Sequence, residues 1–198
     1  YFHKKGVDVT FFSDYYPEGH QSGVSIIQHG VRVAANGDLR LEVSPGQWDP
    51  VPKGGKRTEF PDEQRITQRL WFPDSTKDKR GFNPVVYPDL RFFYDVSIQA
   101  DKDGGFTVTV DLDEALPEEW VGKVGFNLEL FPGDLFGKAF IMDGKSGIFP
   151  EQAVGPVQEV HGRIIGEAMA SGSSLVVAPE CDRQRLLIRS RQNPLELW

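Results

Sequence analysis

Carboxylate side chains are the groups in this 198-residue chain that could most directly carry out chemistry. Glu129 lies in a segment of alternating apolar and polar residues, so Asn127 and Glu129 should share one face of a β-strand. A carboxylate beside an amide can hydrogen-bond to sugar hydroxyls. Sugar hydrolysis needs a second carboxylate, and Asp134 and Asp143 follow in the next loops. A solvent-facing row on an outer sheet explains the same pattern without any catalytic role.

Aromatic side chains offer a different chemistry, because flat rings stack on the apolar C–H faces of sugars. Trp48 lies between prolines in a loop, and Tyr15 and Tyr16 are adjacent near the N-terminus. We expect these three residues to form platforms for carbohydrate. The alternative is that they cover the open ends of a β-sandwich. Trp71 and Trp120 are interpreted as packing residues.

Metal and cofactor chemistry has little support in the sequence. No histidine is paired with another histidine or a cysteine at the spacing of zinc ligands, and Cys181 is interpreted as incidental. We expect His29 to lie within a strand, with a hydrogen-bond partner. Phosphate-binding and serine-hydrolase motifs do not occur. We therefore predict no cofactor and no metal; the histidines considered are His3, His20, His29 and His161.

Composition limits the possible partners. The chain has 22 Lys and Arg against 29 Asp and Glu, a formal charge of −7, which argues against nucleic acid as a partner. No run of eighteen apolar residues occurs, so no membrane-spanning segment is expected. With 39% hydrophobic and 26% charged residues, the chain has the composition of a globular protein.

Alternation of apolar and polar residues with period two predicts β-strands in several segments of the chain. Residues 91–100 and 105–112 alternate clearly, and the turn-forming segment 101–104 between them predicts a hairpin. A second hairpin turn is predicted at residues 36–38. Residues 44–63 and 73–88 are rich in Gly, Pro and charge, and we expect two long exposed loops there. Further strands are expected at 7–12, 24–33, 38–43, 66–72, 124–131, 138–142, 174–178 and 185–189.

The fold class follows from these elements. Roughly ten or more short strands with little helix predict an all-β protein, an antiparallel β-sandwich. We expect residues 1–198 to form a single domain, and we expect the native polypeptide to continue beyond Trp198.

Several segments of the sequence resemble one protein family. The first two segments are Phe-Phe-Ser-Asp-Tyr-Tyr at 11–16 and Ser-Gly-Val-Ser-Ile-Ile-Gln-His-Gly-Val-Arg at 22–32. The next is Ser-Pro-Gly-Gln-Trp-Asp-Pro at 44–50. Gly-Phe-Asn-Leu-Glu-Leu-Phe-Pro at 125–132 and Met-Asp-Gly-Lys-Ser-Gly-Ile-Phe-Pro at 142–150 continue the likeness. Together they resemble the N-terminal β-sandwich module of large Bacteroidetes-type polysaccharide-degrading glycoside hydrolases, similar to family-nine cellulases.

The resemblance implies a role for the chain. Such a module precedes an α-helical catalytic barrel in a protein secreted to the periplasm or cell surface. The Asp-Ala-Gly-Asp catalytic motif of family-nine enzymes is absent from this chain. We therefore expect a non-catalytic module that supports a catalytic domain in the same polypeptide and contacts glycan. Two alternatives stay open: a glycosidase or lyase that uses Glu129 with Asp134 or Asp143, and a cell-surface interaction domain.

Overall fold

The computed structural model has an antiparallel all-β architecture, which confirms the predicted fold class. Among the described residues the two helical segments are single turns, η1 (Pro61–Glu63) and α1 (Pro132–Leu135). The chain divides into two compact units, and the single-domain expectation stays a prediction. The first unit is Tyr1–Ile27 with Ala34–Glu129, and the second is Gln28–Val33 with Leu130–Trp198. The structure describes residues 2–4, 6–11, 15–16, 19–20, 23–41, 52–72, 92–118, 121–122, 124–152 and 155–198.

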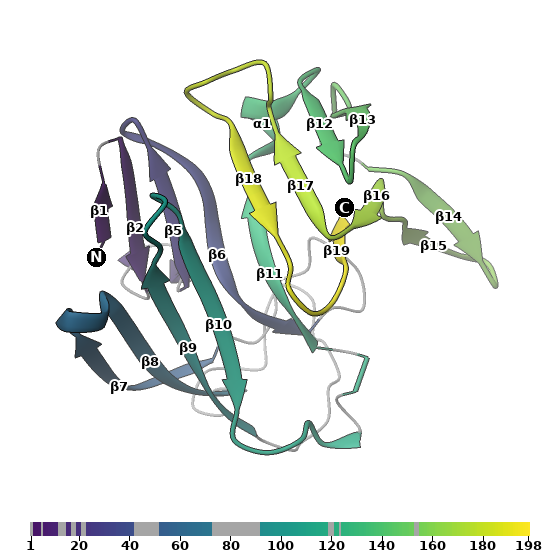
Figure 1. Ribbon diagram of the computed structural model, residues 1–198. Coiled ribbons are helices and arrows are strands. Elements are labelled where there is room, and N and C mark those ends of the chain that lie inside the picture. The colour runs from purple at the N-terminus through teal and green to yellow at the C-terminus, as the bar shows by residue number, and fades with distance from the viewer. Residues whose placement is uncertain are drawn as a thin grey trace. The chain divides into compact units, whose positions relative to one another are not determined.

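Two sheets form most of the first unit (Figure 1). The larger has the order β1-β2-β5-β6-β11, with β1 (Phe2–Lys4), β2 (Val7–Phe11), β5 (Val24–Gln28), β6 (Val31–Leu41) and β11 (Val124–Leu130). The other has the order β10-β9-β8-β7, with β7 (Lys53–Phe60), β8 (Arg65–Phe72), β9 (Phe92–Ala100) and β10 (Phe106–Leu112). A short pair, β3 (Tyr15–Tyr16) and β4 (Gly19–His20), accompanies them.

The core of the first unit lies between its two sheets. Alternate residues of β8 and β9 face inward, where they meet apolar residues of β2, β5 and β6. This is the packing of a β-sandwich, in which every second residue of a strand is buried. The buried members are Val9, Phe11, Val24, Leu39, Ile66, Leu70, Phe92, Tyr94, Val96 and Ile98.

The second unit has its own sheet and its own core. Its four-stranded sheet has the order β13-β12-β17-β18, with β12 (Ala139–Met142), β13 (Lys145–Ile148), β17 (Ser174–Val177) and β18 (Leu186–Arg189). Two strand pairs complete it: β14 (Val157–Val160) with β15 (Arg163–Gly166), and β16 (Ala170–Gly172) with β19 (Leu195–Leu197). The core contains Leu135, Phe140, Met142, Phe149, Leu175, Val177, Ala178 and Leu197.

The hairpin predicted at residues 36–38 is wrong, and so is the strand placement of His29. The chain turns earlier, at His29 and Gly30, and β6 then continues through Asn36 without a break. His29 and Gly30 have φ angles of 50° and 80°, as a two-residue turn between paired strands requires. Asn36 does adopt the positive φ (54°) that its residue type suggested, but it does so inside a strand.

Tertiary contacts explain why β6 stays a strand at this point. A Cβ atom on Gly37 would lie 2.7 Å from the Cβ of Val24, so the glycine is needed for close approach to β5 and not for a turn. Asp38 is buried, and its Oδ1 accepts hydrogen bonds from the Leu39 amide (2.7 Å) and the Tyr94 hydroxyl (3.0 Å). Burial, together with the charge of Asp38, raises the pKa of Tyr94 well above its usual value.

The long loop predicted at residues 44–63 is wrong in its second half. Residues 53–60 form edge strand β7, and η1 follows directly. The register between β7 and β8 shifts between Gly54 and Arg57, which makes a β-bulge. Glycine, lysine and a bulge are devices that protect an edge strand from unwanted pairing, and they gave this segment the composition of a loop. The second predicted loop, at residues 73–88, lies outside the described residues.

Candidate functional site

The aromatic residues predicted to bind sugar are largely outside the described part of the chain. Trp48 is not among the described residues. The backbone of Tyr15 and Tyr16 forms β3, but the side chains of these two tyrosines are not described. Their predicted role therefore stays a prediction.

Asn127 and Glu129 lie on β11 and are both half-buried. Glu129 accepts a hydrogen bond through Oε2 from the side-chain amide of Asn36 on the neighbouring strand β6, at 2.5 Å. Asn36 is itself buried. The carboxylate of Glu129 therefore has a structural partner between two strands of the larger sheet.

The two other candidate carboxylates belong to the second unit, whereas Glu129 belongs to the first. Asp134 is exposed on the single-turn helix α1. Asp143 accepts hydrogen bonds from the backbone amides of Ser173 and Ser174, both at 2.9 Å, and from the Ser173 hydroxyl. These bonds, led by that of the Ser173 amide, lower the pKa of Asp143. A group held ionised in this way is a poor general acid at neutral pH. The catalytic hypothesis stays a prediction.

In the described first unit, polar and aromatic groups gather on the outer face of the β7–β10 sheet. We use "outer face" for the side opposite the buried residues of β8 and β9. Its centre is a row of hydroxyl side chains that crosses all four strands, because directly paired residues of antiparallel strands share a face. Thr67 and Ser97 are hydrogen-bonded at 2.9 Å through their hydroxyls. This hydroxyl row consists of Thr58, Thr67, Ser97 and Thr109.

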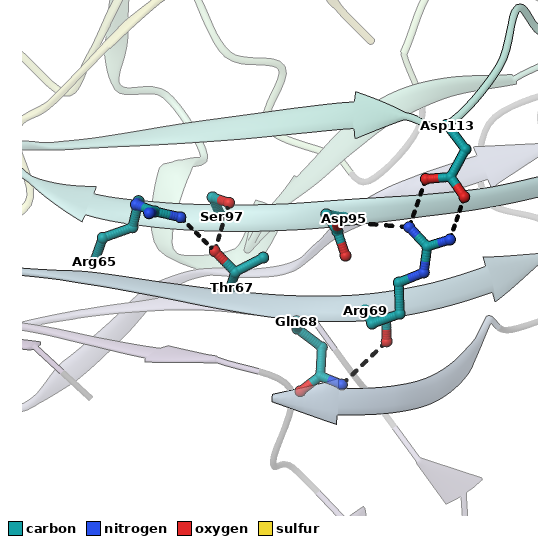
Figure 2. Close-up of polar contacts among 7 residues, drawn as sticks. All are labelled: Arg65, Thr67, Gln68, Arg69, Asp95, Ser97 and Asp113. Carbon is teal, nitrogen blue, oxygen red and sulfur yellow. Dashed lines mark hydrogen bonds and ion pairs between the residues drawn. The ribbon is translucent and has the colours of Figure 1, made fainter. Parts of the chain in front are cut away.

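Arg69 forms an ion-pair cluster at one end of the outer face (Figure 2). Its two terminal nitrogens donate to the two carboxylate oxygens of Asp113, and Nη1 lies 3.5 Å from Asp95 Oδ2. Hydrogen bonding to Asp113 raises the pKa of Arg69, and the same bond lowers the pKa of Asp113. The planar guanidinium group is therefore fixed in place, with donor and acceptor atoms side by side.

Two aromatic rings lie next to this cluster. Phe93 is 47% exposed, and its ring centre lies 6.2 Å from that of Trp71 and 5.5 Å from Arg69 Cζ. The bulge in β7 makes room for Trp71, since a Cβ atom on Gly55 would lie 3.3 Å from the tryptophan ring. Gln68, on the buried side of β8, donates to the Gly55 carbonyl at 2.9 Å and so holds the bulge.

Arg65 occupies the other end of the outer face. Its guanidinium carbon lies 3.8 Å from the centre of the Phe60 ring, a cation–π arrangement. Arg65 also donates to Glu63 (2.9 Å) and to the hydroxyl of Thr67 (3.0 Å). The outer face therefore has an arginine paired with a carboxylate and an aromatic ring at each end, with hydroxyls between them.

The sequence predicts three of the four strands of this face, β8, β9 and β10, but not which side chains gather on it. The alternation in residues 91–100 indicates which side of the strand is buried, but it assigns no role to the opposite side. The signal was present in the residues between the apolar ones: Arg65, Thr67, Arg69 and Trp71 on β8, and Phe93, Asp95 and Ser97 on β9. Trp71, interpreted as a packing residue, is half-buried on this outer face.

The described ranges contain no group of three or more His, Cys, Asp or Glu side chains placed to hold a metal ion. No helix in the part that the structure describes has the length and apolar character to cross a membrane. No family model, curated protein or solved structure matches this chain.

Proposed function

We propose that this chain is a non-catalytic β-sandwich module of a secreted polysaccharide-degrading enzyme, and that it binds glycan on the outer face of the β7–β10 sheet. The observation that carries the proposal is the combination of an exposed and a half-buried aromatic ring, fixed arginine–carboxylate pairs and a hydroxyl row on one sheet face. The link to an enzyme comes from the sequence resemblance alone. We expect the full native polypeptide to contain a helical catalytic barrel, and its presence would confirm the link.

Stacking provides the apolar part of the binding. Phe93 and Trp71 present ring surface at the edge of the outer face, where the C–H face of a sugar ring can lie against it. Arg69, fixed over Phe93 by Asp113, keeps that ring in place. Little side-chain entropy is lost on binding, because these groups are already ordered.

Hydrogen bonding provides the polar part. A sugar carries neighbouring hydroxyls, each of which can both donate and accept. The Arg69–Asp95 pair offers a donor next to an acceptor, which suits two adjacent hydroxyls of one sugar. The exposed Thr109 and the half-buried Thr58 and Thr67 offer further hydroxyls, whereas Ser97 is buried and bonded to Thr67. The ion pairs of this face are partly open to solvent, so we expect weak binding, with Kd on the order of 0.1–1 mM.

The test is binding of the chain to soluble neutral polysaccharides: mixed-linkage β-glucan, xyloglucan and galactomannan, measured by isothermal titration calorimetry. Phe93→Ala should weaken binding of the recognised polymer by about fivefold to tenfold, the loss expected for one stacking contact. Trp71→Ala should weaken it similarly, with the folded state of both variants checked by circular dichroism.

The matched control is Phe136→Ala, which removes an aromatic ring of the second unit that is 42% exposed. This variant should bind as the unmodified protein does. If neither the neutral polymers nor a charged polysaccharide binds, the glycan-binding proposal is wrong. If the unmodified protein and Phe93→Ala bind equally well, glycan binding occurs somewhere other than on the outer face.

A further inference from the structure

We infer that the outer face selects uncharged glycans and rejects polyuronates, because both of its arginines are already neutralised by carboxylates of the same face. This inference rests on the proposed function and specifies the ligand class of that site. It follows from how the charges are paired, which the sequence alone does not reveal.

The pairing leaves no strong anion site on this face. Arg69 is held in bidentate fashion by Asp113 and lies near Asp95, and Arg65 donates to Glu63. Asp113 occupies the bidentate edge formed by the two terminal nitrogens of Arg69, and a uronate carboxylate would have to compete with it there. Binding a uronate at Arg69 would therefore require displacement of a carboxylate that is tethered in place.

The surrounding charges oppose an anion as well. Asp111 is exposed and is the register partner of Asp95, so two carboxylates lie on adjacent strands beside the cluster. Lys56 is exposed at the β7 bulge, but one solvated ammonium group contributes little to binding. The chain as a whole carries a charge of −7, which adds long-range repulsion of a polyanion.

A neutral sugar meets none of these obstacles. Its hydroxyls can donate to the remaining lone pairs of Asp95 and Asp113 and can accept from Thr67 or Thr109. The carboxylates that exclude a uronate thus become the acceptors that hold a neutral sugar. The same residues account for both binding and selection.

The decisive variant is Asp95→Asn with Asp113→Asn, which keeps the size of both side chains and leaves Arg69 without a carboxylate partner. Polygalacturonate and mixed-linkage β-glucan, xyloglucan and galactomannan are the probes, titrated calorimetrically at low ionic strength. The unmodified protein should bind a neutral polymer and show no heat with polygalacturonate. The double variant should bind polygalacturonate and should bind the neutral polymer several-fold more weakly.

A charge-matched control separates a freed arginine from a change in overall charge. Glu159→Gln with Glu167→Gln removes two exposed carboxylates of the second unit, neither of which belongs to an arginine–carboxylate pair of the described residues. This control should still reject polygalacturonate; if it gains the same binding as the double variant, overall charge governs selection and the inference is wrong. Tight binding of polygalacturonate by the unmodified protein would also overturn the inference, while leaving a glycan-binding face intact. Absence of binding to every probe would instead remove the proposed function itself.

Discussion

Asp143 closes a turn of the second unit with three hydrogen bonds from Ser173 and Ser174. Two of the donors are backbone amides, so the carboxylate fixes the backbone of the segment that leads into β17. Gly172 is packed against the same group, since a Cβ atom there would lie 2.5 Å from Asp143 Oδ2. The carboxylate therefore has a structural use that depends on its negative charge.

The pH dependence of stability should report that charge. A carboxyl group whose pKa falls on folding stabilises the folded state above its unfolded-state pKa of about 3.9, and this contribution disappears as pH falls through the lower folded-state pKa. Asp143→Asn should therefore lower the urea unfolding midpoint at pH 7. The difference from the unmodified protein should stay constant down to about pH 5 and then shrink between about pH 4 and pH 3.

Ser173→Ala is the companion variant for this measurement. It removes one of the three donors, the hydroxyl, and keeps both backbone amides. Its effect should be smaller than that of Asp143→Asn and should follow the same course with pH. An Asp143→Asn effect of equal size at pH 7 and pH 3 would show that the charge of the carboxylate does not stabilise the turn.

Arg69 and Asp95 show which properties of the outer face can be predicted from the sequence. Alternation within each strand assigns both residues to the side opposite the core, because the period-two pattern depends only on neighbouring residues. The pairing of Arg69 with Asp113 joins residues 44 positions apart, which requires the register of three strands. Neither residue type nor spacing reveals such a register, so the charge pairing of this face could not be predicted.

Hairpin turns are the elements that define most of the local topology. In the described ranges, three of them have two central residues that both have positive φ: His29–Gly30, Asp143–Gly144 and His161–Gly162. Each connects consecutive antiparallel strands, namely β5 to β6, β12 to β13 and β14 to β15. Positive φ at both positions matches the right-handed twist of the strands, and glycine at the second position allows it without strain. Both histidines therefore occupy turn positions, with no need of a metal-binding role.

This turn geometry predicts opposite effects for two substitutions of His29. His29→Asn places the preferred residue of such a turn before Gly30 and should stabilise the protein by about 0.5 kcal/mol. His29→Val places a β-branched residue at φ 50° and should destabilise it by about 1–2 kcal/mol. Urea unfolding of the three proteins measures both changes.

The second histidine turn serves as an internal check. His161 has the same φ of 50° before a glycine, so His161→Asn should act in the same direction as His29→Asn. Stabilisation by His29→Val, or destabilisation by both asparagine variants, would show that side-chain contacts and not backbone conformation determine these positions.

Elements with a strong local signal were predictable, and elements held by tertiary contacts were not. The β9–β10 hairpin is confirmed, because both strands alternate clearly and residues 101–104 contain turn formers. The β7 strand was missed because its glycines and lysines have the composition of a loop, although pairing with β8 makes it a strand. The turn expected at Asn36 does not form, because Gly37 packs closely against Val24 and Asn36 donates a hydrogen bond to Glu129, which keeps this segment within the larger sheet.

The whole chain carries a charge of −7, which bears on any ligand it binds. Binding of a polyanion or a polycation to such a chain would depend steeply on salt, because mobile ions screen or are released on association. A neutral polymer has no such dependence. Ionic strength is therefore a property of the solution that distinguishes ligand classes without any substitution.

We expect the Kd of the unmodified protein for its neutral polymer to change by less than about twofold between about 0.1 M and about 1 M NaCl, although the screening length falls from about 10 Å to about 3 Å. Polygalacturonate binding by the Asp95→Asn, Asp113→Asn variant should fall steeply over the same range, which makes it the positive control. The two salt dependences have to be compared with each other, because salt also strengthens apolar stacking slightly. A neutral polymer whose binding fell as steeply as that of polygalacturonate would mean that exposed charges, and not rings and paired carboxylates, hold the glycan.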